Sequence, residues 1–287
     1  MQAHLSPTPP PPTRRRIDVP VDPVTGAVGS ATQSLDRAMD LLEVVVGHTA
    51  SGISLGSVAA IVGLSKPTAH RLLTGLRNGG MIDYDVGERL FFPAFKLYSM
   101  GQAAATRFDV IEVAAASVDR LAEDTGDTVF LSARSGDFVV CVARRMGAFP
   151  IKTLTLDVGD VRPLGVGANG VALLAALRDD EVERNLERHK LALRAWPRFD
   201  AASIRLYVAA ARKNGLAFQE GLLMPEMSSL ALGIRSTGGR IDAAISLAAI
   251  NSRLQEPRRS SLANMLRQEV DAIERLMEER AEARPRN

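Results

Sequence analysis

Residues 54–93 read SLGSVAAIVGLSKPTAHRLLTGLRNGGMIDYDVGERLFFP, and this stretch decides the fold of the first part of the chain. Ser54 and Ser65 are favourable N-cap residues, and each precedes apolar residues at the three-and-four spacing of an amphipathic helix. Gly63 ends the first helix. Pro67 is tolerated in the first turn of the second helix, and the pair Gly79-Gly80 ends it. The stretch therefore predicts two short helices joined by a glycine turn.

A β-hairpin is expected directly after the second helix. Residues 81–84 and 89–92 are short extended segments, and the turn between them contains a glycine. Another amphipathic helix is expected before the stretch, from Ser34 to Val46. Helix, short helix, turn, helix and hairpin is the order of a winged helix-turn-helix, so we predict a DNA-binding domain at 33–93 and a linker helix at 94–107.

The second helix of the pair has a face suited to DNA. If its apolar residues point inward, Arg71 and Thr74 point outward on a face without a carboxylate. Arginine can bind guanine edges, and threonine or lysine can bind phosphates. The candidate DNA-binding residues are Ser65, Lys66, Pro67, Thr68, His70, Arg71, Thr74 and, in the hairpin, Arg89. A helical protein-interaction module with a solvated face is the alternative.

Beyond residue 108 the pattern predicts an α+β domain, residues 108–287, with a mainly antiparallel sheet flanked by helices. We expect strands at 128–133, 138–143, 151–156, 229–235 and 241–248, and helices at 110–123, from 179, at 201–213 and from about 257. The predicted fold class of the whole chain is therefore α+β: an N-terminal winged helix-turn-helix, a linker helix and this C-terminal domain.

Composition restricts the function classes. The chain has 287 residues, enough for about two domains, and a net charge of 35 − 33 = +2 that by itself predicts no nucleic-acid partner. Residues 1–32 hold seven prolines and a triple arginine, which predicts a disordered arm. Without a long apolar run or a signal segment we expect no membrane and a cytoplasmic location. A single cysteine and scattered histidines predict no metal and no cofactor.

Residues 165–170, GVGANG, have the G-x-G-x-x-G spacing of dinucleotide-binding loops and run into a helical pattern. Arg162 and Pro163 interrupt the strand that should precede such a loop. The nearest acid at the required offset, Glu187, lies in a charged helical run. We therefore expect a glycine turn that opens a helix beside some other ligand.

Five segments together carry a family resemblance: QSLDRAMDLLEVV (33–45), SLGSVAAIVGLSKPTAHRLLTGL (54–76), RLAEDTGDTVFL (120–131), RPLGVGANGVALLAAL (162–177) and DAAISLAAINSRL (242–254). In them the chain resembles IclR-type bacterial transcriptional regulators. The resemblance implies a winged helix-turn-helix that binds double-stranded operator DNA as a homodimer or homotetramer. It also implies a C-terminal domain that binds a small, often acidic, effector.

The resemblance further implies the pocket residues, which are Gly167, Ala168 and Asn169 in the glycine loop and Gln219, Ser229, Ser246 and Ala248 on strands. Cys141, in a predicted strand, is a further candidate for contact with the effector. Ser229 stands where some members have cysteine, Ala248 where some have serine, and Gln219 where an acid is usual. These departures make the pocket less polar, which argues against glyoxylate- or pyruvate-like ligands and leaves an aromatic or longer acid open. The alternatives are core hydroxyls for the two serines and a small buried hydrophobic role for Cys141.

The functional prediction is a ligand-responsive transcription factor, with repressor and activator both open. The alternative is an enzyme, or a ligand-binding interaction module without DNA control. The pocket segments hold no Ser/His/Asp set, paired carboxylates or histidine, so we expect no catalytic residues and no enzyme.

Overall fold

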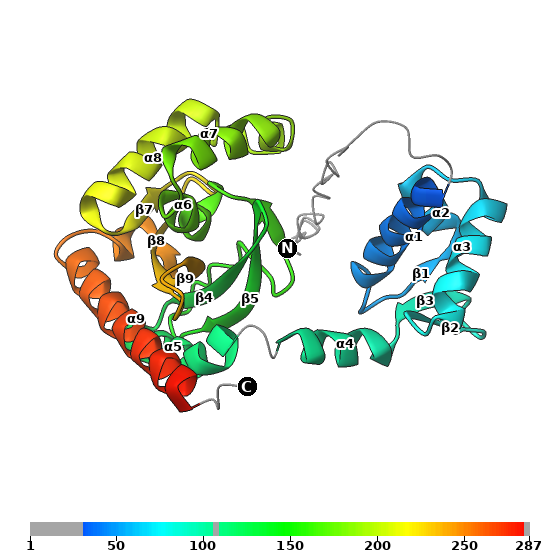
Figure 1. Cartoon of the computed structure of the whole chain (residues 1–287), viewed down its shortest axis with the longest axis horizontal. Helices are drawn as coiled ribbons and strands as arrows, with labels where there is room; N and C mark the ends of the chain where they lie inside the picture. Colours follow the sequence, from blue (N-terminus) through cyan, green and yellow to red (C-terminus); the bar gives the residue numbers. More distant parts are fainter. Residues whose placement is uncertain (1–30, 106–108, 284–287) are drawn as a thin grey trace, which may run out of the picture. The chain divides into compact units, whose positions relative to one another are not determined.

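The computed structural model describes residues 31–105 and 109–283, which belong to two compact units divided at residue 109. Most of the predicted disordered arm, residues 1–30, lies outside the described residues. Its last two residues, Ala31 and Thr32, begin the first helix. Figure 1 shows the two units, the first in blue and cyan and the second in green to red.

The first unit is a winged helix-turn-helix, as predicted. Its elements are α1 (Ala31–Val46), β1 (Ile53–Ser54), α2 (Leu55–Val62), α3 (Lys66–Asn78), β2 (Ile82–Asp85), β3 (Leu90–Pro93) and α4 (Phe95–Ala105). The Ser54 side chain caps α2 by accepting from Ser57 N at 3.1 Å, and Gly63 ends it at φ 72°. The helices pack around a core that includes the fully buried Leu41, Val58 and Leu73.

The second unit is an α+β domain with the predicted antiparallel sheet. Its helices and strands are α5 (Asp109–Thr125), β4 (Thr128–Ser135), β5 (Phe138–Met146), β6 (Val161–Pro163), α6 (Gly167–Ala175), α7 (Asp179–Arg188), α8 (Ala201–Asn214), β7 (Ala217–Glu220), β8 (Met227–Arg235), β9 (Ile241–Ile250) and α9 (Arg258–Ala283). The strands form one sheet in the order β6-β5-β4-β9-β8-β7, with neighbouring strands antiparallel.

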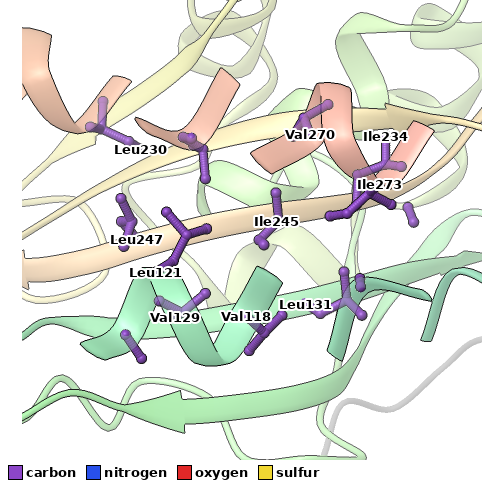
Figure 2. Close-up of a cluster of buried hydrophobic side chains, with 14 of the residues drawn as sticks. Val118, Leu121, Val129, Leu131, Leu230, Ile234, Ile245, Leu247, Val270 and Ile273 are labelled. Carbon is purple, nitrogen blue, oxygen red and sulfur yellow. The ribbon is translucent and has the colours of Figure 1, made fainter. Parts of the chain in front are cut away.

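Helices cover the sheet on both faces (Figure 1). On one face α5 and α9 lie side by side over a cluster that includes Leu131, Ile245 and Leu247 (Figure 2). On the other face α6, α7 and α8 pack over a second cluster that includes Leu173 and Ile204. Successive side chains of a strand point to opposite faces, so the even-numbered residues of β4 and β9 point to the side of α6.

The predicted strand at 151–156 is wrong. Ile151 and Leu154 are 53% and 60% exposed, and the segment is an irregular loop. The edge of β5 is occupied instead by residues 159–163: Gly159 N donates to Cys141 O at 2.8 Å, and β6 continues the pairing. Pro163 is tolerated there because β6 is an edge strand. The short strands β1, β6 and β7 were not predicted.

Candidate functional site

The exposed face of α3 agrees with the sequence prediction. Ala69 and Leu73 are buried in the core of the first unit. Thr68 is half-buried. The other six candidates in this segment are exposed: Ser65, Lys66, Pro67, His70, Arg71 and Thr74. Since the helix contains no aspartate or glutamate, its outer face offers cationic and hydroxyl donors without an acid to neutralise them.

Arg89 lies in the turn between β2 and β3 and is exposed. Its φ of 58° is in the left-handed region, which is uncommon for a residue other than glycine. The hairpin contacts α3 through the Arg77 guanidinium, which lies 5.9 Å from the Tyr84 ring; within the hairpin that ring lies 4.7 Å from the Phe91 ring. Arg89 and α3 therefore belong to one packed unit.

A small pocket lies between the sheet and the start of α6. Its lining contains seven of the eight predicted effector-binding residues: Cys141, Gly167, Ala168, Asn169, Ser229, Ser246 and Ala248. The eighth, Gln219, lines a smaller neighbouring pocket that shares Ser229 and Ala248 with the first. Segments far apart in the sequence are thus brought to one place.

The strand register explains this convergence. Ser246 and Ala248 are even-numbered residues of β9, which pairs with β4 at Phe130 and Thr128. Their side chains face the pocket while those of Ile245 and Leu247 enter the core under α5 and α9. The alternation that builds the core therefore also builds the pocket wall.

The helix α6 presents its N-terminus to the pocket. Its N-cap, Val166, has no side chain that can satisfy the first backbone N–H groups. Asn169 is 5% exposed; its Nδ2 donates to Ser132 Oγ at 2.8 Å, while its Oδ1 has no partner in the part of the chain that the structure describes. Uncapped helix N-termini favour anions.

The glycines of GVGANG serve packing. Gly165 has φ 90°, and a Cβ there would lie 2.9 Å from Ile204 Cγ2; a Cβ at Gly170 would lie 3.0 Å from Gly165 N. The strand before the loop, β6, is antiparallel to β5. A dinucleotide site needs parallel strands around such a loop, so the expectation of another ligand stands.

Arg162 is a pocket residue that the sequence analysis missed. It is 7% exposed, its Nη2 donates to Thr155 O, and its guanidinium lies 5.0 Å from the Trp196 ring centre. Burial lowers the pKa of the guanidinium to about 10, an effect that the Asp160 carboxylate opposes. The group is therefore a cation at neutral pH. In the sequence Arg162 had signalled only an interrupted strand.

Cys141 forms part of the pocket wall as a neutral thiol. It is 1% exposed and its Sγ donates to Ala143 O at 3.6 Å. Burial raises the pKa of the thiol to about 11, and reactive cysteines need a thiolate. Cys141 can therefore contact a ligand but has little nucleophilic or redox character.

Two family models match the chain over most of its length. Residues 34–86 match the IclR helix-turn-helix domain, and residues 102–275 match the model described as bacterial transcriptional regulator IclR C-terminal. The chain belongs to the IclR family. As an IclR-family transcriptional regulator it has a DNA-binding helix-turn-helix domain and a C-terminal ligand-binding domain.

Similar proteins agree with this membership. The DNA-binding transcriptional repressor YiaJ of Escherichia coli K12 is 25% identical over 247 residues, which cover 85% of this IclR-family chain and 87% of YiaJ. An IclR regulator from Alicyclobacillus acidocaldarius shares the fold, with 23% identity, a TM-score of 0.71 and coverage of 85% and 98% of the two chains. An IclR homologue from Microbacterium hydrocarbonoxydans complexed with 4-hydroxybenzoate has 19% identity, the same TM-score and the same coverage.

Within residues 31–105 and 109–283 there is no group of three or more histidine, cysteine or acidic side chains that could hold a metal ion. No helix in those ranges is long and apolar enough to span a membrane. The relatives are named as regulators or repressors, and such proteins are not enzymes.

Proposed function

We propose that the chain is a cytoplasmic transcriptional regulator whose affinity for operator DNA is set by a small carboxylic acid bound in the pocket beside α6. The observation that carries the DNA part is the exposed face of α3, where Arg71 and Thr74 project without a neighbouring carboxylate. The observation that carries the effector part is the uncapped start of α6, which opens onto a pocket lined by buried polar groups.

The proposed DNA contacts divide into two sets. Arg71, Thr74 and His70 are proposed to approach base edges in the major groove, where arginine binds guanine. The start of α3, from Ser65 to Thr68, is proposed to bind phosphates, since helix N-termini and lysine favour anions. Arg89 would then meet the backbone or the minor groove beside the hairpin.

Arg71→Ala should weaken operator binding about tenfold or more, because a side chain that bonds a base is worth roughly 1–3 kcal/mol. A gel-shift titration with the DNA upstream of the chain's own gene measures this at fixed salt. Arg77→Ala is the matched control, since Arg77 is on the same helix but lies over the Tyr84 ring. We expect it to lose less than about threefold. Equal losses in both variants would contradict the assignment of the α3 face.

The proposed effector contacts are Gly167, Ala168, Asn169, Ser229, Ser246, Ala248, Gln219 and Cys141. Gln219 is 3% exposed, and neither atom of its amide has a hydrogen-bond partner within the described ranges. A buried amide without partners is costly, so we propose that it bonds a second polar group of the effector. Phe130, Leu156 and Leu223 line the main pocket, the one that contains Asn169, and favour an apolar body. The 4-hydroxybenzoate bound by the Microbacterium homologue has such chemistry.

We also propose a homodimer, or a homotetramer built from it. Leu35 and Met39 of α1 are 62% and 48% exposed, and Phe95 and Tyr98 of α4 are 77% and 61% exposed. Exposed apolar groups of this size commonly mark interfaces, and identical chains pair most often about a two-fold axis.

The double variant Phe95→Ser/Tyr98→Ser should raise the dimer dissociation constant about tenfold or more, because buried aromatic anchors dominate interface energies. Sedimentation equilibrium measures this directly. Val86→Ser is the control, since Val86 is 75% exposed at the hairpin tip, and it should leave the association unchanged. A wild-type chain that stays monomeric at micromolar concentration would exclude the dimer.

A further inference from the structure

Arg162 is a buried cation without a counter-ion in the described ranges. Arg144, Arg253 and Arg258 have side chains that are 23%, 23% and 33% exposed, and each binds an aspartate. Arg162 is more deeply buried, at 7% exposed, and forms no ion pair within residues 31–105 and 109–283. A buried charge is normally paired, because removing it from water is expensive.

Asp160, the acid whose charge opposes the lowering of the Arg162 pKa, forms no ion pair with Arg162. Asp160 is half-buried, and its Oδ2 accepts from Asp157 N at 2.7 Å within the loop. Arg162 Nη2 binds a carbonyl, that of Thr155, while Nη1 has no hydrogen-bond partner among the residues described. One arm of the guanidinium is therefore available to a ligand in the pocket that Arg162 lines.

The free arm lies at the N-terminus of α6. A Cβ built on Gly167 would be 3.7 Å from Arg162 Nη1, so the guanidinium is close to the first residue of the helix. Gly167 has φ 77°, which glycine adopts without strain, and it places no side chain beside the guanidinium. The positive end of the helix dipole and the guanidinium thus act on the same part of the pocket.

We propose that Arg162 is the counter-charge for the effector's carboxylate, which makes the pocket selective for monoanionic aromatic acids. The inference rests on the proposed function, in which this pocket is the effector site. The carboxylate would accept from Arg162 Nη1 and from the first backbone N–H groups of α6, and charge-assisted bonds of this kind are short and strong. Asn169 Oδ1, an acceptor, suits a hydroxyl of the ligand.

The test compares acids with their neutral amides on the full chain. Benzoate and 4-hydroxybenzoate, each against the matching amide and against sodium chloride at equal ionic strength, are titrated by calorimetry and thermal shift. We expect the acids to raise the wild-type melting temperature and the amides to have little effect. Arg162→Gln should weaken acid binding about 10–100-fold, because bonds to charged groups dominate such sites. Arg162→Lys should recover part of that loss.

Arg144→Gln is the matched control. Arg144 Nη1 donates to Leu156 O at 3.0 Å, in the same loop that Arg162 binds, but Arg144 is paired with Asp157 and does not line the pocket. This variant should bind acids as the wild type does. Arg162→Met separates binding from folding: without acid it should melt at or above the wild-type temperature, since it removes a buried unpaired charge.

The inference is overturned if neither acid shifts the wild type beyond the chloride control, if the amides bind as tightly as the acids, or if Arg162→Gln binds acids like the wild type. Operator binding by the wild type without acid is measured separately by gel shift. If the wild type does not bind the operator, the proposed regulation of DNA binding is overturned, whereas the acid-binding result is unaffected.

Discussion

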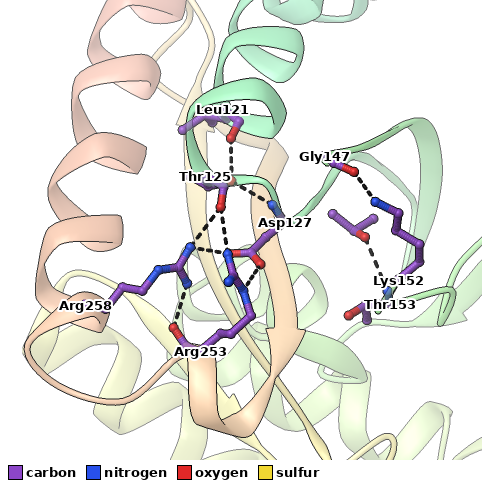
Figure 3. Close-up of polar contacts among 9 residues, drawn as sticks. Leu121, Thr125, Asp127, Gly147, Lys152, Thr153, Arg253 and Arg258 are labelled. Carbon is purple, nitrogen blue, oxygen red and sulfur yellow. Dashed lines mark hydrogen bonds and ion pairs between the residues drawn. The ribbon is translucent and has the colours of Figure 1, made fainter. Parts of the chain in front are cut away.

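Asp127→Ala should lower the free energy of unfolding of the second unit by about 3–5 kcal/mol, the cost of removing one partner from a buried ion pair. The Asp127 side chain is 1% exposed and accepts from Arg253 Nε and Arg258 Nη2, each at 2.7 Å (Figure 3). The same two arginines bind Thr125 O, at the end of α5, at 2.9 and 3.0 Å. Alanine would leave both cations without their carboxylate.

Urea unfolding followed by the fluorescence of Trp196 measures this change. Trp196 is the only tryptophan of the chain and belongs to the second unit, so its signal reports that unit. The control is Asp119→Ala, which removes the ion pair with Arg145 at a site where the two side chains are 43% and 59% exposed. Its cost should stay below about 1 kcal/mol. Similar losses for both variants would mean that burial does not decide the energy of the Asp127 cluster.

Leu247→Ala should cost about 3–5 kcal/mol, the range for a buried leucine whose neighbours close in only partly. Leu247 is fully buried at the centre of β9, where it pairs in register with Val129 and Leu230. Figure 2 shows it within the cluster between the sheet and the helices α5 and α9. Strands lie on both sides of β9, which limits how far the backbone can move to fill the space.

Leu276→Ala is the control for this core change. Leu276 is on α9 and is 44% exposed, so the same truncation removes little buried surface and should cost less than about 1 kcal/mol. Urea unfolding followed by Trp196 fluorescence again measures both variants. The free energy of unfolding must fall with urea concentration at the same slope in the two, so that a shift of the midpoint reports stability alone. A Leu247→Ala loss no larger than that of Leu276→Ala would show that this cluster carries little of the stability.

The parts of the structure that sequence predicted well are those with local causes. Ser54 and Gly63 mark the ends of α2 because capping depends on a few consecutive residues. The strand β9 was predicted from the alternation of its residues, because successive side chains of a strand point to opposite faces and this two-residue period decides which of them are buried. The exposed face of α3, with Arg71 opposite Leu73, followed from helical periodicity alone.

The parts that sequence missed depend on distant partners. Residues 151–156 have strand-forming composition, but residues 159–163 take the edge of β5 that they would need. Asp127 meets Arg253 across 126 positions, a separation that leaves no periodic signal. Arg162 looked like an interruption because a strand-edge arginine usually faces water. Its burial depends on Trp196 and on the pocket, both placed by tertiary packing.

The glycine loop before α6 has a consequence for how short motifs are used. Gly165, Gly167 and Gly170 keep the G-x-G-x-x-G spacing because a turn must bend sharply and pack closely against the helix that it starts. That requirement is the same whether the neighbouring strands run parallel or antiparallel. A search that uses glycine spacing alone therefore collects loops of one shape and unrelated chemistry. Strand direction is the second criterion that such a search needs, because the dinucleotide-binding loop belongs to a parallel sheet, whereas β6 is antiparallel to β5.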